Sequence, residues 1–151
     1  MKKSFNIILV LILILLPLNI SLPQEVKSFN RTDKPKHSTV QQAIFSEIEK
    51  ALGSGNVSVI SRYFSPQTYF SLSNGVSGYY SSNQSFYILE DFFSIYKVSS
   101  FRFKNIQADE NNPYATGIYT FESKGQKGTS QVYVSLKNIG GSWKITQITI
   151  N

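Results

Sequence analysis

The sequence contains no cysteine, and this absence excludes disulfide bonds, thiolate metal sites and cysteine nucleophiles. Histidine occurs once, as His37, in a polar stretch where a general base lacks a fixed position against its substrate. A Ser-His-Asp triad is therefore not expected, and no glycine-rich motif that cradles a phosphate is present. We expect a protein with no cofactor, no bound metal and no catalytic constellation.

Positive charge is scarce in the part of the chain that has the hydrophobic pattern of a fold. The whole sequence carries 15 Lys and Arg against 9 Asp and Glu, but from position 39 onward the counts are nine and seven. A nucleic-acid-binding domain concentrates its basic residues on the folded part. The low net charge of this region argues against a nucleic-acid partner.

The longest hydrophobic run lies at the start of the chain. Residues 1–22 combine Lys2 and Lys3 with an apolar run at positions 7–16, which Pro17 ends. A transmembrane helix needs about 20 apolar residues, whereas a secretory signal uses a shorter run. We expect residues 1–22 to be a signal peptide, so that the protein is periplasmic or secreted and keeps no stable membrane span after cleavage. An uncleaved N-terminal anchor is the alternative.

The rest of the chain divides into a linker and one domain. Residues 23–38 lack a hydrophobic period and mix charged residues with proline, which is typical of a flexible linker. Residues 39–151 are enough for a single domain with an ordinary hydrophobic core.

The first amphipathic helix is expected at residues 39–52. At 100° per residue, its apolar side chains fall within one arc of about 140°. Ser38 with Gln41, or Thr39 with Gln42, has the spacing of a capping box, and Gly53 is a natural stop. The apolar stripe consists of Val40, Ile44, Phe45, Ile48, Ala51 and Leu52.

Two further helices are predicted. Asn56 can cap a short helix at residues 57–64, which ends before Pro66, and a strand is expected at 67–73. A longer helix is expected to start at Ser82, because Ser81 and Gln84 again have capping-box spacing.

Glu90 and Asp91 are adjacent carboxylates in the most aromatic stretch of the chain, "GYYSSNQSFYILEDFFSIY". An acid/base pair would need both on one side of the helix. On the helical wheel each lies about 130° from the centre of the apolar arc, on opposite sides. We therefore expect both to face solvent or the helix margins.

After this helix the hydrophobic period changes to two. Short turn signals separate four such segments, which predicts an antiparallel meander. In the last segment Trp143 and Ile145 share one face, whereas Ile148 and Ile150 share the other, and this phase slip predicts a bulge or a sharp bend. The four segments are 98–107, 114–123, 128–138 and 142–151.

The order of helices and strands indicates an α+β fold. It resembles the cone-shaped nuclear transport factor 2-like superfamily and, within it, an uncharacterised family of exported bacterial domains. The segments "AIFSEIEKALGSGNVSVISRYF", "GYYSSNQSFYILEDFF" and "VYVSLKNIGGSWKITQITI" carry the resemblance, which covers about residues 40–151. It implies N-terminal helices packed on a strongly bent antiparallel sheet, and it brings no assigned activity.

The same resemblance leaves an enzymatic alternative open, because the superfamily includes isomerases and dehydratases that work in the mouth of the cone. A pocket enzyme of that kind would use Asp91 or Asp109 as its acid and a tyrosine as its electrophile. Asp109 and Glu110 could also hold a cation, but a polar hairpin loop is the preferred interpretation.

Tyrosine is the remaining signal, with nine residues in the chain. Tyr63, Tyr69 and Tyr119 are candidates to line a ligand cavity between helix and sheet, with their hydroxyls inward. Tyr119 shares a strand face with Ala115 and Gly117, where small side chains would leave space. Core packing or a dimer contact is the alternative.

These observations favour an exported, non-catalytic domain that binds a small apolar ligand or an envelope protein. Two alternatives stay open from the sequence alone. One is the pocket enzyme, and the other is a structural homodimer that pairs sheet to sheet.

Overall fold

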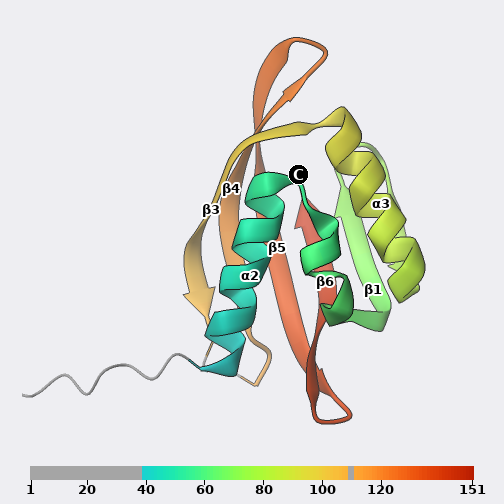
Figure 1. The fold of residues 1–151 in the computed structure, drawn as a ribbon, viewed down its shortest axis with the longest axis vertical. Coiled ribbons are helices and arrows are strands. Elements are labelled where there is room, and N and C mark those ends of the chain that lie inside the picture. The colour runs from blue at the N-terminus through green and yellow to red at the C-terminus, as the bar shows by residue number, and fades with distance from the viewer. Residues whose placement is uncertain (1–38, 109–110) are drawn as a thin grey trace, which may run out of the picture. The chain divides into compact units, whose positions relative to one another are not determined.

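The computed structural model describes residues 39–108 and 111–151 (Figure 1). The predicted signal peptide, the linker and His37 lie outside these ranges. The described part folds into two α-helices, two 3₁₀ turns and a six-stranded sheet. In chain order the elements are α2 (Val40–Ser54), η1 (Val57–Val59), η2 (Ser61–Tyr63), β1 (Phe64–Leu72), β2 (Ser77–Tyr80), α3 (Ser82–Ile95), β3 (Lys97–Gln107), β4 (Tyr114–Ser123), β5 (Gln126–Ile139) and β6 (Ser142–Ile150).

Helix α2 begins where the sequence predicts. The Oγ1 atom of Thr39 accepts the backbone N–H of Gln42 at 3.2 Å, and the Oε1 atom of Gln42 accepts the N–H of Thr39 at 3.2 Å. This capping box satisfies two N–H groups that a helix start leaves unpaired. The helix runs past the predicted stop at Gly53 and ends at Gly55, whose left-handed φ of 67° suits glycine.

The second capping box is also confirmed, because Ser81 and Gln84 cap the start of α3. The predicted helix at residues 57–64 is wrong. Asn56 does cap the segment, but it forms only η1 and η2, and Phe64 already has extended backbone at the start of β1. Pro66 disfavours helical backbone in the residue before it, so the chain turns to strand early.

The sheet has the order β2-β1-β6-β5-β4-β3. Strands β3 to β6 form the predicted antiparallel meander. One part of the expectation needs correction, because β1 pairs with β6 in parallel, so the sheet is mixed rather than wholly antiparallel. The four-residue strand β2, which the sequence did not predict, pairs with β1 and forms one edge of the sheet.

Irregular pairing bends this sheet at several places. The ladder between β5 and β6 shifts register between Ser135 and Leu136, which confirms the phase slip predicted in the last strand. Further shifts lie in the β1–β6 and β3–β4 ladders. Extra residues of this kind increase local twist, and the sheet curves around the helices (Figure 1).

Both helices cover one face of the sheet, with α2 against β3 and α3 against β1 (Figure 1). The core lies between the helices and this inner face. Glu90 and Asp91 are exposed, as predicted, whereas Val40 at the first turn of α2 is 64 % exposed and does not belong to the core. Within residues 39–108 and 111–151, no helix has the length and hydropathy needed to cross a membrane. Fully buried core side chains include Phe45, Ile48, Phe70, Leu89, Phe92, Tyr119, Ile145 and Ile148.

Candidate functional site

Tyr119, one of the three predicted ligand residues, is packed in the interior. Its side chain is fully buried, and its hydroxyl donates to the carbonyl of Tyr96 at 2.5 Å. The rings of Phe92, Phe93 and Phe121 lie with their centroids 5.8–6.2 Å from its own. Burial raises the pKa of Tyr119 above its ordinary value. The phenol is thus neutral and hydrogen-bonded inside an aromatic cluster.

The space that the sequence predicts beside Ala115 and Gly117 is occupied by strand β3. A Cβ atom on Gly117 would lie 2.4 Å from the carbonyl oxygen of Arg102 and 3.0 Å from the ring of Phe101. The small residues therefore let β3 approach β4 closely. This part of the cone is filled by the protein itself.

Tyr69 lies on the opposite side of the sheet from Tyr119. Its neighbours Thr68 and Phe70 are fully buried, whereas Tyr69 is half-buried on the side away from the helices. Its hydroxyl is 3.2 Å from the Oγ atom of Ser77, and its ring lies 5.1 Å from that of Tyr79. Tyr69 and Tyr119 therefore cannot line one cavity.

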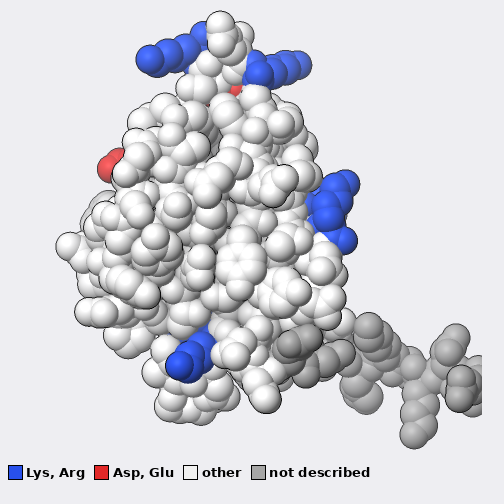
Figure 2. All heavy atoms as spheres, turned by 180° about the vertical axis from the view of Figure 1, so that it is seen from behind, with Lys and Arg blue, Asp and Glu red and all other residues white. Residues whose placement is uncertain are grey.

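The side of the sheet turned away from α2 and α3, which we call the outer face, has an uncharged centre. Figure 2 shows this side, with charged side chains only at its margins. A hollow of about 390 Å³ lies over β4 and β5, with Ile118 and Tyr133 in its lining and Lys104 at its edge. Arg102 of the edge strand β3 is the cross-strand partner of Ile118 and marks the limit of the uncharged centre. This centre consists of Tyr69, Ser71, Ser77, Tyr79, Tyr114, Thr116, Ile118, Thr120, Thr129, Gln131, Tyr133, Ser135, Gln147 and Thr149.

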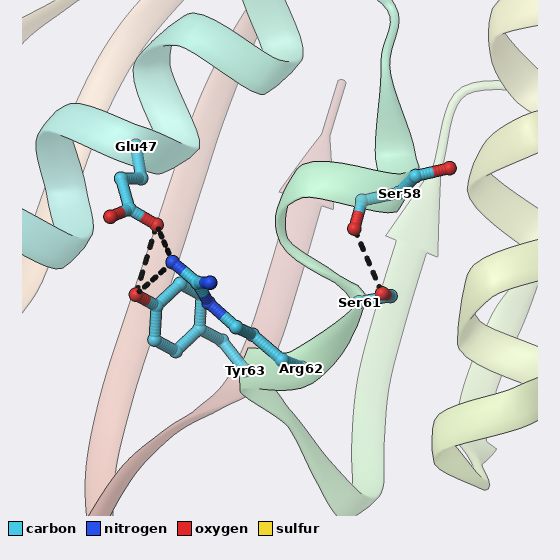
Figure 3. Close-up of polar contacts among 5 residues, drawn as sticks. All are labelled: Glu47, Ser58, Ser61, Arg62 and Tyr63. Carbon is cyan, nitrogen blue, oxygen red and sulfur yellow. Dashed lines mark hydrogen bonds and ion pairs between the residues drawn. The ribbon is translucent and has the colours of Figure 1, made fainter.

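Tyr63, the third predicted residue, belongs to a polar cluster between η2 and α2 (Figure 3). Its hydroxyl donates to the Glu47 carboxylate at 2.9 Å, and Arg62 donates to the same oxygen at 2.6 Å. Arg62 also donates to the Tyr63 hydroxyl at 3.1 Å, with its guanidinium carbon 4.9 Å from the centre of that ring. These contacts attach η2 to α2 at the surface.

Beside this cluster is a second hollow, of about 380 Å³, which we call the tryptophan hollow. It lies between the start of α2, η2 and the turn from β5 to β6. Val40, Tyr63 and Trp143 give it apolar walls, and Arg62 and Lys144 give it two cations. Of the three predicted residues, Tyr63 is the one that lines this hollow, and its ligand-binding role stays a prediction.

The cluster makes stability depend on pH through Glu47. The hydrogen bond from Tyr63, with that from Arg62, lowers the pKa of Glu47 below its ordinary 4.5. A carboxyl group whose pKa is lower in the folded than in the unfolded protein stabilises the fold in full at pH values above its unfolded pKa. This stabilisation is lost as the pH falls through the folded pKa. We therefore expect Glu47→Gln to lower the thermal midpoint slightly at neutral pH, with a difference that disappears as pH falls below 4.5.

Thermal unfolding followed by circular dichroism between pH 7 and pH 3 measures this difference. Glu90→Gln is the matched control, because it removes an exposed carboxylate from α3. A Glu47→Gln deficit that grows on acidification would contradict the assignment.

The structure describes one of the two candidate acids of the enzymatic alternative. Asp91 is exposed on α3, and Asp109 and Glu110 lie outside the described residues. Among the residues that the structure describes, no three His, Cys, Asp or Glu side chains come together as a metal site.

Sequence reasoning located neither the outer face nor the polar cluster of Glu47, Arg62 and Tyr63. The outer face was readable in principle, since every second residue of β4 from Tyr114 to Thr120 is uncharged and partly exposed. The contact of Glu47 with Arg62 joins residues 15 positions apart and had no local signal.

Comparison with known proteins places the chain in a family. Residues 45–151 match the model of the "Domain of unknown function (DUF4783)". No curated protein matches the chain.

Solved structures share the fold. A DUF4783 family protein from Bacteroides uniformis is 20 % identical, with 70 % of this chain and 94 % of that one covered and a TM-score of 0.63. One from Bacteroides ovatus is 21 % identical, with coverage of 70 % and 91 % and a TM-score of 0.60. A ketosteroid isomerase-like protein from Erwinia carotovora atroseptica is 10 % identical, with coverage of 77 % and 95 % and a TM-score of 0.60. Since the family model spans more than half of the chain, the protein belongs to the DUF4783 family, a domain of unknown function with the nuclear transport factor 2-like fold.

Proposed function

We propose that this protein is an exported, non-catalytic domain that makes protein–protein contacts through the outer face of its sheet, first of all with a second copy of itself. The observation that carries the proposal is the uncharged, tyrosine-rich centre of that face. Export rests on the sequence of residues 1–22.

The composition of the outer face suits protein contact. Tyr69, Tyr79, Tyr114 and Tyr133 lie on it, and Tyr79 is 70 % exposed. Tyrosine adds large contact area at low entropic cost, and hydroxyl and amide side chains provide adaptable hydrogen bonds. The rings of Tyr114 and Tyr133 stack at 5.7 Å, which holds them in place before a partner arrives.

The size and charge of the face favour a second copy. The five strands that carry this face lie about 4.8 Å apart, and some seven residues of about 3.3 Å each along them give roughly 550 Å². This is the scale of the ~800 Å² that each partner contributes to a standard interface. A charged surface repels its own copy, whereas an uncharged centre can meet itself across a two-fold axis.

The non-catalytic part of the proposal rests on the interior. A pocket enzyme needs a carboxylate inside the cone with a raised pKa. Tyr119 and its aromatic neighbours fill that space, and Asp91 lies on the surface. The packed interior also argues against a small apolar ligand in the cone.

The test uses the full chain, expressed in a bacterial host and recovered from the periplasmic fraction. Intact mass should show that about residues 1–22 are missing, and sedimentation velocity should show a dimer. Ile118→Lys, in the lining of the hollow on this face, should weaken the dimer at least ~100-fold, because each copy would bury an unpaired lysine charge in the contact.

Ile95→Lys is the matched control, since Ile95 is also an exposed isoleucine, at 49 % against 37 % for Ile118, but lies on α3. It should leave the dimer unchanged. A monomer at all concentrations, or equal weakening by both variants, would refute pairing through this face. Full-length protein retained in the cytoplasm would separately refute export.

A further inference from the structure

The tryptophan hollow combines an apolar floor with an excess of positive charge. Val40 is 64 % exposed at its rim, and Trp143, the single tryptophan of the chain, is half-buried in its wall. Its volume of about 380 Å³ is within the range of about 300–1,000 Å³ for small-molecule sites. An accessible apolar surface rimmed by charged residues is typical of a ligand-binding groove.

Three cations surround this hollow or adjoin it. Arg62 and Lys144 line it, and Lys137 is the direct cross-strand partner of Lys144. Like charges opposite each other in a sheet are destabilising, so this pair does not serve the stability of the hairpin. In the described part of the chain, Arg62 is paired with Glu47, and no ion pair includes Lys137 or Lys144.

The two lining cations are held in place and still have free donors. The ammonium of Lys144 donates to the carbonyl of Arg62 at 2.7 Å, which uses one of its three N–H groups. The Nη2 atom of Arg62 donates to Glu47 and Tyr63, which leaves its other nitrogens available. Donors fixed by such contacts lose little entropy when they bind an anion.

We propose that the tryptophan hollow binds a small carboxylate that carries an apolar chain or ring. The carboxylate accepts hydrogen bonds from Lys144 and Arg62, and the apolar part packs between Trp143, Tyr63 and Val40. A carboxylate matches the planar donors of arginine, and its charge complements the lysine pair. This site lies apart from the outer face and does not depend on the function proposed for that face.

Fluorescence of Trp143 reports on this hollow alone, because the chain has no other tryptophan. Octanoate, titrated below its micelle concentration into the protein, should shift and saturate the emission. Octanamide and octylamine, which have the same chain without a carboxylate, should bind at least ~10-fold more weakly, since a hydrogen bond to a charged group supports about that ratio. Equal binding of octanamide would overturn carboxylate recognition, and no saturable change with octanoate would overturn the site.

Two sets of variants test the residues. Lys144→Gln should weaken octanoate about tenfold or more, whereas Lys124→Gln, at the tip of the β4–β5 hairpin, should not. Val40→Glu should abolish binding by placing a negative charge at the rim, and Val40→Lys should preserve it. Because Val40 is exposed at the first turn of α2, both of its variants fold even if Lys144→Gln does not. Equal affinities in the two Val40 variants would refute the proposal.

Discussion

Tyr119→Ala should lower the free energy of unfolding by about 3–5 kcal/mol, the range for removing a large buried ring. Tyr119 is fully buried, and the rings of Phe92, Phe93 and Phe121 surround it. These rings come from α3 and β4, so they cannot collapse into the space without moving a helix against the sheet. Domains of this size are stable by about 5–15 kcal/mol, so the loss is a large part of the total.

Tyr119→Phe separates the hydroxyl from the ring. It keeps the packing and removes only the hydrogen bond to the carbonyl of Tyr96, so the expected loss is about 1–3 kcal/mol. Urea unfolding of the two variants and the parent protein measures both quantities. A loss of under 1 kcal/mol for Tyr119→Ala would mean that the interior around this ring is open rather than packed.

Tyr119→Ala also tests whether the cone contains a ligand cavity. An apolar cavity left by a large side chain stays dry and binds small arenes. Benzene should therefore raise the thermal midpoint of Tyr119→Ala and leave that of the parent protein unchanged, because bound ligand stabilises only a state that has room for it. A similar rise in the parent would show that the cone already holds a ligand-sized space.

The sequence was most informative where structure is decided locally. The capping boxes at Thr39 and Ser81 fixed both helix starts, because a cap depends on side chains three residues apart. The period-two pattern located β3 to β6, and the phase slip between Ile145 and Ile148 located a bulge.

Long-range pairing was the part that the sequence could not supply. The parallel contact of β1 with β6 joins Phe70 to Ile148, and no local pattern distinguishes a parallel neighbour from an antiparallel one. Strand β2 was missed for a similar reason. Its four residues carry turn-forming glycine and serine, and they become a strand only because β1 lies beside them.

For the candidate site, too, the sequence indicated residue types but not their positions in the fold. Tyrosine content singled out Tyr63, Tyr69 and Tyr119 as ligand candidates, but it could not tell which side of the sheet each ring would face. Tyr119 packs inside, Tyr69 lies on the outer face, and Tyr63 borders the tryptophan hollow. A one-residue offset along a strand separates core from surface, so residue type alone cannot assign a site.

Gly117→Ala should destabilise the fold by about 3 kcal/mol, near the upper end of the range for an overpacked core. The new methyl group would lie 2.4 Å from the carbonyl oxygen of Arg102 and 3.0 Å from the Cα atom of Phe103. Both are backbone atoms of β3, so the strand itself has to move away from β4. That movement also pulls Phe101, a buried residue, out of its contacts.

Gly53→Ala is the matched control for this substitution. A Cβ atom on Gly53 would have no neighbour closer than 3.9 Å, and the residue lies inside α2. Alanine there should stabilise the fold by about 0.5–1 kcal/mol, because it restricts the unfolded chain and favours helix. Urea unfolding should therefore move the two midpoints in opposite directions. If Gly117→Ala is as stable as the parent, β3 does not pack against β4 at this position, and the space predicted beside Tyr119 is available to a ligand.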